Sequence, residues 1–517
     1  MSQAIELSLF ASRVAAACEE MGAALGRAAF SPNIRDRLDY SCALFDARGR
    51  LLGQATHIPV HLGSMAHAMQ DLVAARDWDD GDELVVNDPF AGGTHLPDVT
   101  LVRPVFHEGG LAGFCANRAH HADIGSDAPG SMPVSRCLEE EGMVIPPTLL
   151  SEGGEENRAF LEDWYARVAR PDIARGDLAA QRTANRTGAR RLGALLGMLG
   201  HGRFEQLNDA LQDYAEQLVV AHLAELGQGT AGFTDLMDGD GLGASDVPIH
   251  VNVQLDGGRV TVDFEGTGAQ VQGNINCPLA VTAAAVHYVF RCLAPPQAPS
   301  CEGAMRPVTI RAPEGCLVNA QPPAAVAAGN VETSQRIVDA VCGALAALVP
   351  DRIPAASQGT MNNLAMGARG ERGWDYYETL AGGAGGGPSA PGRSGRHTHM
   401  TNTLNTPIEV LERHYPLRVE RYALRRGSGG DGRFRGGDGV VRALRFLADA
   451  EVSLLTERRT HAPWGLAGGE AGQAGRNLLD GQDLPGKCQL SVKHDQVLEI
   501  HTPGGGGFGP PRSDDTE

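Results

Sequence analysis

The stretch NDPFAGGTHLPDVTLVRPVFHEGGLAGFCANRAHHADIGSD spans residues 87–127 and holds the densest group of His and Asp side chains in the chain. Two apolar runs inside it, residues 99–106 and 111–116, flank a Gly-containing break at residues 107–110. Such runs with a short connection that contains glycine predict a β-hairpin. The His and Asp residues then lie at the open end of the hairpin, in loops held by a sheet, where site residues are common.

Imidazole and carboxylate groups crowd this open end. His95 and Asp98 precede the first strand, and His120, His121 and Asp123 lie at the end of the second. These His and Asp side chains suit a divalent ion such as zinc, manganese or iron. Burying such polar side chains is costly unless they bind a ligand or one another. Alternation in an extended segment turns His120 and His121 to opposite sides, so one is expected to be a ligand and the other an acid or base. The alternative is a hydrogen-bonded loop network.

Two further groups lie before the hairpin. Asp36 or Asp39 could complete a metal shell from a distance in sequence, although the local sequence favours a solvated turn with a salt bridge for both. His57 and His61 are four residues apart and could share a helical face. Because Pro59 stands between them, we expect no helix there and assign both histidines a structural role.

Two glycine-rich stretches, residues 382–387 and 504–509, superficially resemble phosphate-binding loops. Proline follows each of them, so neither can begin a helix whose N-terminus would receive a phosphate. We therefore expect no ATP site in this chain. Residues 382–387 are interpreted as a mobile or substrate-covering loop.

His397 and His399 follow that loop two residues apart, which on an extended segment would place both rings on one face. With the amide of Asn402 they would line a pocket for a cyclic amide or imide substrate. A purely structural role is the alternative.

Composition narrows the class of protein. The 517 residues carry a formal net charge of −19 and contain no block rich in Lys and Arg, which argues against nucleic acid or an anionic membrane as a partner. No apolar run reaches the length of a membrane span, and the N-terminus resembles a helix rather than a signal peptide. The ten scattered cysteines are expected to be reduced. Together these features predict a cytoplasmic protein.

Periodicity predicts a large, multi-domain α/β chain of mixed α+β character, with mixed sheets. Helical spacing is expected in residues 5–29, 63–75, 280–292 and 333–348, and a second hairpin in residues 249–264. The expected regions are an N-terminal α/β part that holds the metal site, a helical part, an α/β part with a hairpin and a glycine-rich loop, and a β-rich C-terminal part, at residues 1–150, 151–235, 236–415 and 416–517.

Seven stretches of the chain resemble the B-type component of the hydantoinase B/oxoprolinase family, over about residues 4 to 510. They are NDPFAGGTHLPDVTLVRPVF, NRAHHADIGSDAPGSMP, EEGMVIPP, GNINCPLAVTAAAV, HTHMTNTLNTPIEVLE, YPLRVERYALRRGSGGDGRFRGG and PGGGGFGPP. The family includes ATP-dependent N-methylhydantoinases, 5-oxoprolinases and caprolactamase, together with acetone and acetophenone carboxylases.

The resemblance implies a heteromer in which ATP is bound by a partner, a hydantoinase A-type ATPase subunit, that phosphorylates the substrate. This chain would carry a divalent metal ion and open the ring. The metal ligands that the resemblance implies are His95, Asp98, His120 and either Asp39 or Asp36, with the remaining His and Asp of the cluster beside them. A ketone carboxylase subunit is the alternative activity. A scaffold that only organises the ATPase subunit is a third possibility.

Overall fold

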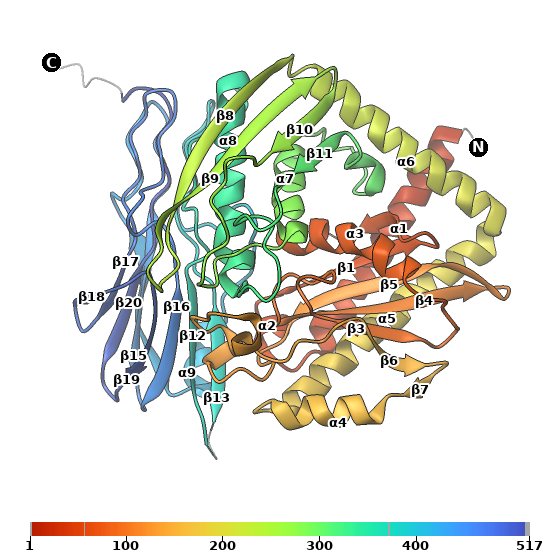
Figure 1. The fold of residues 1–517 in the computed structure, drawn as a ribbon, viewed down its shortest axis with the longest axis horizontal. Coiled ribbons are helices and arrows are strands. Elements are labelled where there is room, and N and C mark those ends of the chain that lie inside the picture. Colours follow the sequence, from red (N-terminus) through yellow and green to blue (C-terminus); the bar gives the residue numbers. More distant parts are fainter. Residues whose placement is uncertain (1–2, 56, 371–372, 512–517) are drawn as a thin grey trace.

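A computed structural model describes residues 3–55, 57–370 and 373–511 of the chain. Figure 1 shows the N-terminal sheet with its helices on one side of the molecule and the C-terminal strands, in blue, on the other. The expected mixed α/β architecture with several sheets is confirmed. Within the described ranges, no helix is both long and apolar enough to cross a bilayer.

The largest sheet is antiparallel, with the order β2-β1-β5-β4-β3-β6-β7. Its strands and the three helices against it are β1 (Tyr40–Asp46), β2 (Leu51–Gln54), β3 (Glu83–Val86), β4 (Asp98–His107), β5 (Gly110–His120), β6 (Thr148–Glu152), β7 (Glu155–Glu156), α1 (Gln3–Ala28), α3 (Pro59–Ala74) and α5 (Pro171–Leu199). Every residue of β1 is buried because helices cover both faces. Phe45 packs in the core on the α3 side, whereas Leu44 packs in the core of α1 and α5.

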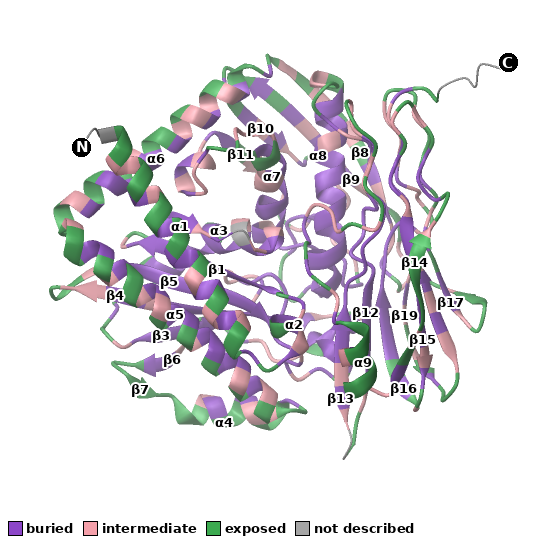
Figure 2. Ribbon diagram, turned by 180° about the vertical axis from the view of Figure 1, so that it is seen from behind, coloured by how far each residue is buried: buried purple, intermediate pink, exposed green. Residues whose placement is uncertain are grey.

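Short and long helices surround this sheet. They are α2 (Pro32–Arg35), α4 (Arg158–Arg167), α6 (His201–Ala224) and 3-10 turns at Pro129–Ser131 and Leu138–Glu141. Figure 2 shows bands of exposed residues along α5 and α6, whose other faces are buried. The helical section expected in the second quarter of the chain is therefore present, with one apolar face on each helix.

A four-stranded sheet and two buried helices occupy the middle of the molecule. The sheet order is β11-β10-β9-β8, and the elements are β8 (Gly229–Gly239), β9 (Ser245–Asp256), β10 (Arg259–Asp263), β11 (Val308–Arg311), α7 (Leu279–Leu293), α8 (Ser334–Leu348) and a 3-10 turn at Glu302–Ala304. The hairpin of β9 and β10 is the second hairpin expected from the sequence. A π-helical turn, Gly329–Thr333, precedes α8 directly.

The C-terminal part is a sandwich of two antiparallel sheets around one apolar core. One sheet is β13-β12-β16-β19 and the other β14-β15-β20-β17-β18. The elements are β12 (Asn363–Ala368), β13 (Trp374–Glu378), α9 (Ile408–His414), β14 (Leu417–Arg425), β15 (Gly439–Phe446), β16 (Ala450–Leu455), β17 (Arg476–Leu479), β18 (Gln482–Leu484), β19 (Lys487–Val492) and β20 (Val497–His501).

The expected region boundaries do not coincide with breaks in this architecture. The boundary at residue 150 falls inside β6 and that at residue 235 inside β8. The boundary at residue 415 separates β12 and β13 from β16 and β19, which belong to the same sheet. Because these sheets pair strands across the boundaries, a change of composition along the chain does not divide it into units.

The glycine-rich stretches pack against one another, which corrects the interpretation of residues 382–387 as a mobile cover. The amide of Gly505 donates to the carbonyl of Gly437, and the amide of Gly386 donates to the carbonyl of Gly506. A Cβ atom on Gly505 would lie 2.1 Å from the carbonyl oxygen of Ala384. Glycine is required here because backbones from distant segments lie in direct contact.

Candidate functional site

The hairpin of β4 and β5 brings the two halves of the His/Asp cluster together. Asp98, the first residue of β4, is paired across the ladder with His120, the last residue of β5. His95 lies in the turn that leads into β4, and its backbone carbonyl accepts a hydrogen bond from the amide of Asp98. The expectation that the cluster lies at the open end of a hairpin is thus confirmed.

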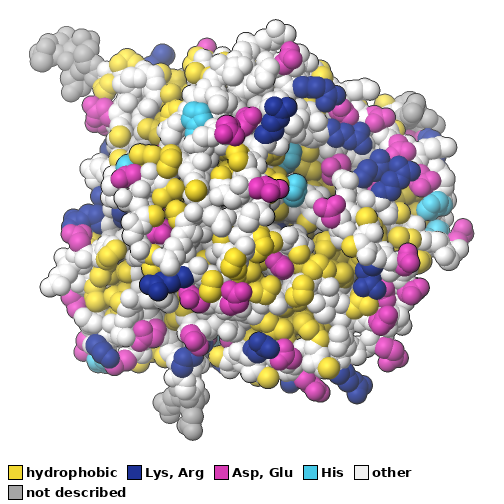
Figure 3. All heavy atoms as spheres, in the orientation of Figure 1, with side chains coloured by type: hydrophobic (Ala, Val, Ile, Leu, Met, Phe, Trp, Pro, Cys, Tyr) yellow, Lys and Arg dark blue, Asp and Glu magenta, His cyan; other side chains and the backbone are white. Residues whose placement is uncertain are grey.

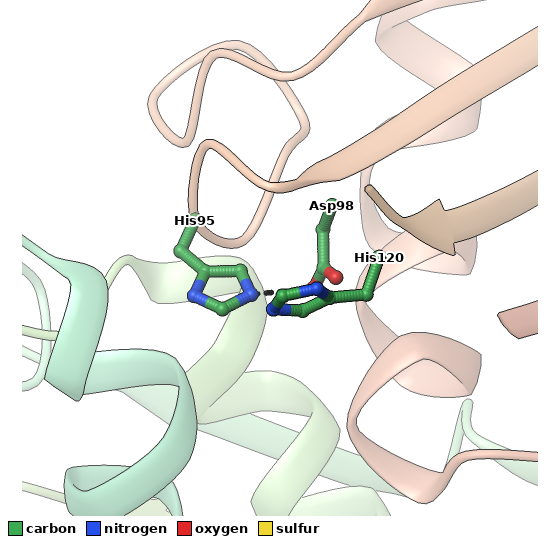
Figure 4. Close-up of side chains that lie close together, drawn as sticks. All are labelled: His95, Asp98 and His120. Atoms are coloured by element: carbon green, nitrogen blue, oxygen red, sulfur yellow. Dashed lines mark ion pairs between the residues drawn. The ribbon is translucent and has the colours of Figure 1, made fainter. Parts of the chain in front are cut away.

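Figure 4 shows the side chains of His95, Asp98 and His120 converging on one point. One ligand atom of each lies within 4.8 Å of the others, and all three residues are buried. The rings of His95 and His120 meet edge to face, with centroids 5.1 Å apart. These groups line a buried chamber of about 20 Å³, together with side chains from the middle and C-terminal parts of the chain. We refer to it below as the buried chamber.

Asp98 is the centre of this arrangement. Its Oδ2 lies 3.1 Å from Nε2 of His61 and 3.3 Å from Nε2 of His95. The same oxygen accepts a hydrogen bond of 2.6 Å from Thr94 and one of 3.3 Å from the amide of Asn330. Burial alone would raise the pKa of Asp98, but the two imidazoles hold it well below its usual value. Asp98 is therefore an ionised carboxylate inside the protein.

Three potential ligand atoms in the chamber have no hydrogen-bond partner among the described residues: His95 Nε2, Asp98 Oδ1 and His120 Nε2. His95 Nδ1 lies 3.3 Å from the carbonyl oxygen of Ala327. In the tautomer with its proton on Nδ1, that N–H faces the oxygen and Nε2 can bind an ion. Two nitrogen donors and one carboxylate oxygen match the ligand chemistry of zinc or a related divalent ion. Unpartnered buried polar atoms are costly, and an ion would satisfy all three.

His120 is held from two sides. Its Nδ1 lies 3.1 Å from the amide nitrogen of Asn33, and its ring stacks on Tyr377 with centroids 4.8 Å apart and planes 1° apart. The Tyr377 hydroxyl donates to Asn363, whose amide in turn donates to buried Glu332 in the π-helical turn. Burial, with the charge of His95 as a smaller cause, lowers the pKa of His120 well below its usual value. His120 is therefore a neutral imidazole, the form that can bind a metal ion.

The structure separates the two candidate acids that precede the hairpin. Asp39 is buried, lines the chamber and lies 3.7 Å from the guanidinium of Arg37. Asp36 instead pairs with Arg35 at 2.8 Å and does not line the chamber. Burial raises the pKa of Asp39, although Arg37 opposes this shift. Of the two, only Asp39 lines the chamber, and the three groups whose ligand atoms lie within 4.8 Å of one another do not include it.

His61 lies in the chamber, although the sequence predicts no helix that would bring it there. Pro59 does not interrupt a helix here, because it is the first residue of α3. Proline is favoured at that position, where its missing N–H would be unpaired anyway. The helix turns His61 towards Asp98, whereas His57 stays outside the chamber. Proline followed by two turns of apolar residues was the signal that could have predicted this helix.

His121 and Asp123 line a different and larger cavity of about 780 Å³, and neither lines the buried chamber. The amide of Gln181 donates to the carbonyl of Val99, which leaves its oxygen to accept from His121 Nε2 at 3.0 Å. His121 Nδ1 then carries a lone pair with no partner in the described chain. Asp123 accepts hydrogen bonds from Ser131 and from the amides of two loops. Their roles as acid or base stay predictions, at a site beside the chamber rather than in it.

Figure 3 shows hydrophobic side chains gathered on the lower part of one face, the part of the molecule in which Figure 1 places α2, α9 and β13. The large cavity is lined by Phe30, which precedes α2, by Trp374 of β13 and by Val410 of α9. Arg35, Arg369 and several acids border it as well, so its lining mixes both charges with apolar surface.

The segment of His397 and His399 is not the extended strand on which a shared face was expected, because residues 399 and 400 form a turn. His399 has φ 58°, which turns the chain, and its ring lies 3.5 Å from Asp339. Burial lowers the pKa of His397 to about 4, and both of its ring nitrogens lack partners among the described residues. Asn402 is exposed and donates to the carbonyl of His57. Substrate binding by these three residues stays a prediction, and their neighbours Met400, Thr401 and Thr403 line the chamber instead.

Comparisons with known proteins agree with this architecture. The hydantoinase B/oxoprolinase family model matches residues 3–511. The chain is 39% identical to 5-oxoprolinase 1 of Arabidopsis thaliana, over 98% of this chain and 42% of the plant protein. It is 33% identical to a putative D-/L-hydantoinase of the B type from a Pseudomonas strain, over 95% and 87% of the two chains. The crystal structure of an ATP-dependent caprolactamase from Pseudomonas jessenii superposes with a TM-score of 0.92 at 27% identity, over 99% and 92%.

The chain belongs to the hydantoinase B/oxoprolinase family. The family-model match spans every described residue, so it includes the β4–β5 hairpin and the chamber at its end. The chain spans about two fifths of the length of the plant 5-oxoprolinase.

Proposed function

We propose that this protein is the metal-binding part of an ATP-dependent cyclic amide hydrolase and opens its substrate ring at the buried chamber. Membership of the hydantoinase B/oxoprolinase family supports hydrolysis of a cyclic amide. The single observation that carries the metal site is the set of three converging, unpartnered ligand atoms of His95, Asp98 and His120.

A divalent ion bound there would supply a polarised water molecule as the nucleophile for the amide carbon. The protein's own groups have separate tasks. His95 and His120 would each direct a ring nitrogen towards the ion, and Asp98 would contribute the negative charge that favours a cation over water. His61, fixed at 3.1 Å from Asp98, orients that carboxylate. Asp39 adds a second carboxylate at the chamber wall and is the candidate to accept a proton from the attacking water.

We further propose that a separate ATPase part activates the amide. The caprolactamase with the same fold is described as ATP-dependent, and the hydantoinase relative is described as one subunit of its enzyme. The plant 5-oxoprolinase is more than twice as long as the segment that this chain matches. The hydantoinase relative supports a separate partner subunit, whereas the plant relative has its additional length in the same chain. In our proposal a partner subunit phosphorylates the amide oxygen, which makes the ring carbon more electrophilic.

The test begins with the metal. Purified protein is expected to bind about one divalent ion per chain, and His95→Ala and His120→Ala should each lower that occupancy severely. His494→Ala is the matched control, because this histidine is exposed and remote from the chamber. Metal content measured by elemental analysis decides the result. Full occupancy in both chamber variants would refute the metal site.

The reaction is tested with the partner present. Wild-type protein, the ATPase subunit and ATP should open a cyclic amide without added bicarbonate, and the two chamber variants should not. A requirement for bicarbonate would instead indicate a carboxylase. Unchanged ring opening in the variants would leave this chain only a scaffolding role.

A further inference from the structure

Three threonine hydroxyls lie in a row along the lining of the buried chamber. The oxygen of Thr379, which directly follows β13, lies 2.7 Å from that of Thr403, and Thr403 lies 3.5 Å from Thr401. All three residues are buried and line the chamber. None of them belongs to the proposed metal ligands, so the chamber contains hydrogen-bonding groups that the ion does not explain. We call these three residues the threonine row.

Arg37 lies at one end of the row and sets the direction of its hydrogen bonds. Its guanidinium donates to the Thr379 oxygen at 3.2 Å, and a guanidinium can only donate. Within the described ranges, the one acceptor in reach of the Thr379 O–H is the oxygen of Thr403. Thr379 therefore donates to Thr403, whose oxygen is the acceptor and whose own proton is left for another partner.

The Thr403 proton has no good acceptor in the described part of the protein. The Thr401 oxygen, at 3.5 Å, is at the long limit of a hydrogen bond. The carboxylate of Asp39 also lines the chamber, but its partner is Arg37 at 3.7 Å and none of the three hydroxyls. The hydroxyl of Thr403 is therefore a free donor for a molecule that occupies the chamber.

Hydrogen bonds to the backbone hold the row in place. The backbone amide of Leu404 donates to the carbonyl of Arg37 at 3.0 Å, and the side-chain amide of Asn405 donates to the carbonyl of Thr379 at 2.9 Å. Arg37 itself donates to the carbonyl of Tyr377 at 3.0 Å. Three segments that are distant in sequence are thus tied together around the row. A donor fixed in this way needs no rearrangement when negative charge develops beside it.

The size and charge of the chamber suit a small anion beside the ion. Its volume of about 20 Å³ is room for about one water molecule. His95, Asp98 and His120 present unpartnered ligand atoms that suit a cation, whereas Thr403 presents a proton that suits an anion. The guanidinium of Arg37, fully buried behind the row, polarises this donor further. Because a hydrogen bond to a charged acceptor is stronger than one to a neutral acceptor, the row favours an anion over water.

We propose that the threonine row is a small-anion site, in which Thr403, polarised by Arg37 through Thr379, donates a hydrogen bond to a monovalent anion of the size of water. This inference rests on the proposed function for the ion that shares the chamber. In the reaction the anion is hydroxide. One O–H bond of a water molecule breaks, its proton passes to Asp39, and the hydroxide that remains accepts from Thr403 before it attacks the amide carbon. A donor to the anionic form favours that form over neutral water.

Fluoride is the probe, because it has the charge of hydroxide and a similar size. The purified chain is loaded with cobalt(II) and titrated with sodium fluoride at constant ionic strength, and the visible spectrum should change to saturation. Thr403→Val replaces the hydroxyl by a methyl group and should weaken fluoride binding at least about tenfold. Thr403→Ser keeps the hydroxyl and should stay within about threefold of the wild type. Thr406→Val is the matched control, because Thr406 is buried in the same segment and does not line the chamber.

A second variant and a second anion sharpen the test. Thr379→Val cuts the row from Arg37 and should also weaken fluoride binding, and iodide should not bind because it is too large for the chamber. Cobalt content should stay at the wild-type level in every threonine variant, since none of these residues is a ligand.

Four results would each overturn the proposal: no fluoride binding by the cobalt-loaded wild type, wild-type fluoride affinity in either chamber Val variant, a loss in Thr403→Ser equal to that in Thr403→Val, or iodide bound as tightly as fluoride. Reduced cobalt content in Thr403→Val would overturn it as well, because Thr403 would then act on the ion. If fluoride binds as described and ring opening fails, only the proposed function is refuted. If the wild type binds no divalent ion, both are refuted.

Discussion

Tyr377 is the residue on which the orientation of His120 depends. Its ring lies parallel to that of His120, and its hydroxyl is fixed 2.7 Å from Asn363. Arg37 covers the Tyr377 ring at 4.7 Å from its centroid. The imidazole therefore has a flat, rigid support that prevents it from turning away from the chamber.

We expect Tyr377→Leu to lower the metal affinity about 10- to 100-fold, the usual cost of losing a supporting contact around a ligand. Tyr377→Phe keeps the stacked ring and loses only the hydroxyl, so its affinity should lie much closer to that of the wild type. A competition titration with a metal chelator measures all three. The spectrum of the cobalt-substituted protein should change with Leu and not with Phe. Equal affinity of the Leu variant and the wild type would show that the stack does not position His120.

At this scale, the sequence predicts the residues of one hairpin and misses those from elsewhere. His95, Asp98 and His120 are found from local density and from the strand pattern between them. Tyr377 and Asn330 lie more than 200 residues further along the chain and carry no local pattern that marks a site. Only the packing of the C-terminal sheets and of the π-helical turn against the hairpin brings them to the chamber.

The glycine-rich stretches act as one structural element although they are distant in sequence. The amide of Gly430 donates to the carbonyl of Gly505, and the amide of Gly505 donates to the carbonyl of Gly437. The resemblance of residues 504–509 to a nucleotide-binding motif has a packing explanation. Backbone from other glycine-rich segments surrounds residues 504–507 and leaves no room for a side chain there.

Gly505→Ala should therefore destabilise the protein by about 1–3 kcal/mol or more, the cost of forcing extra volume into a packed interior. Its Cβ would lie 2.1 Å from the carbonyl oxygen of Ala384. Gly387→Ala is the matched control, because the nearest atom to its Cβ is 3.7 Å away. Thermal unfolding should show a lower midpoint for the first variant and little change for the second. Equal midpoints would indicate that the glycine-rich stretches are loosely packed.

Elements that depend on local pattern were predictable, and those that depend on partners were not. The hairpins β4–β5 and β9–β10 follow from apolar alternation around short turns. Proline usually interrupts a helix, so Pro59 hides the N-terminus of α3, of which it is the first residue. The close packing of the glycine segments could not be predicted, since hydrogen bonds between distant backbones leave no periodic signal.

At the scale of the whole molecule, buried charges join the middle sheet, α8 and the C-terminal sandwich. Arg458, which follows β16, lies 2.7 Å from Asp235 of β8 and 2.6 Å from Asp339 of α8. All three are buried. Asp339 also faces His399 at 3.5 Å, so the network extends to the segment that walls the chamber. These ion pairs cross the expected boundaries at residues 235 and 415, and paired strands cross them as well. The boundaries therefore do not divide the molecule into separate units.

Removal of Arg458 tests how strongly this network holds the molecule together. Arg458→Met keeps the length of the side chain but leaves two buried carboxylates short of a cation, so we expect a loss of about 3–5 kcal/mol of stability near neutral pH. Arg476→Met breaks an exposed pair of similar length, Arg476–Asp483 at 2.9 Å, and should leave the unfolding midpoint close to that of the wild type. Midpoints of chemical unfolding compare the two.

The pH dependence of that difference follows from Asp235. Burial would raise its pKa, but Arg458 and Arg336 lower it to about 2, below the ordinary value of 3.8. A carboxylate with a lowered folded-state pKa stabilises the protein above the unfolded value and loses this contribution as the pH falls through the folded one. The gap between the wild type and Arg458→Met should therefore be full at neutral pH and narrow as the pH falls from about 4 towards 2. A gap that is constant over this range would mean that Arg458 acts through packing alone, and that its charge does not join the two halves of the molecule.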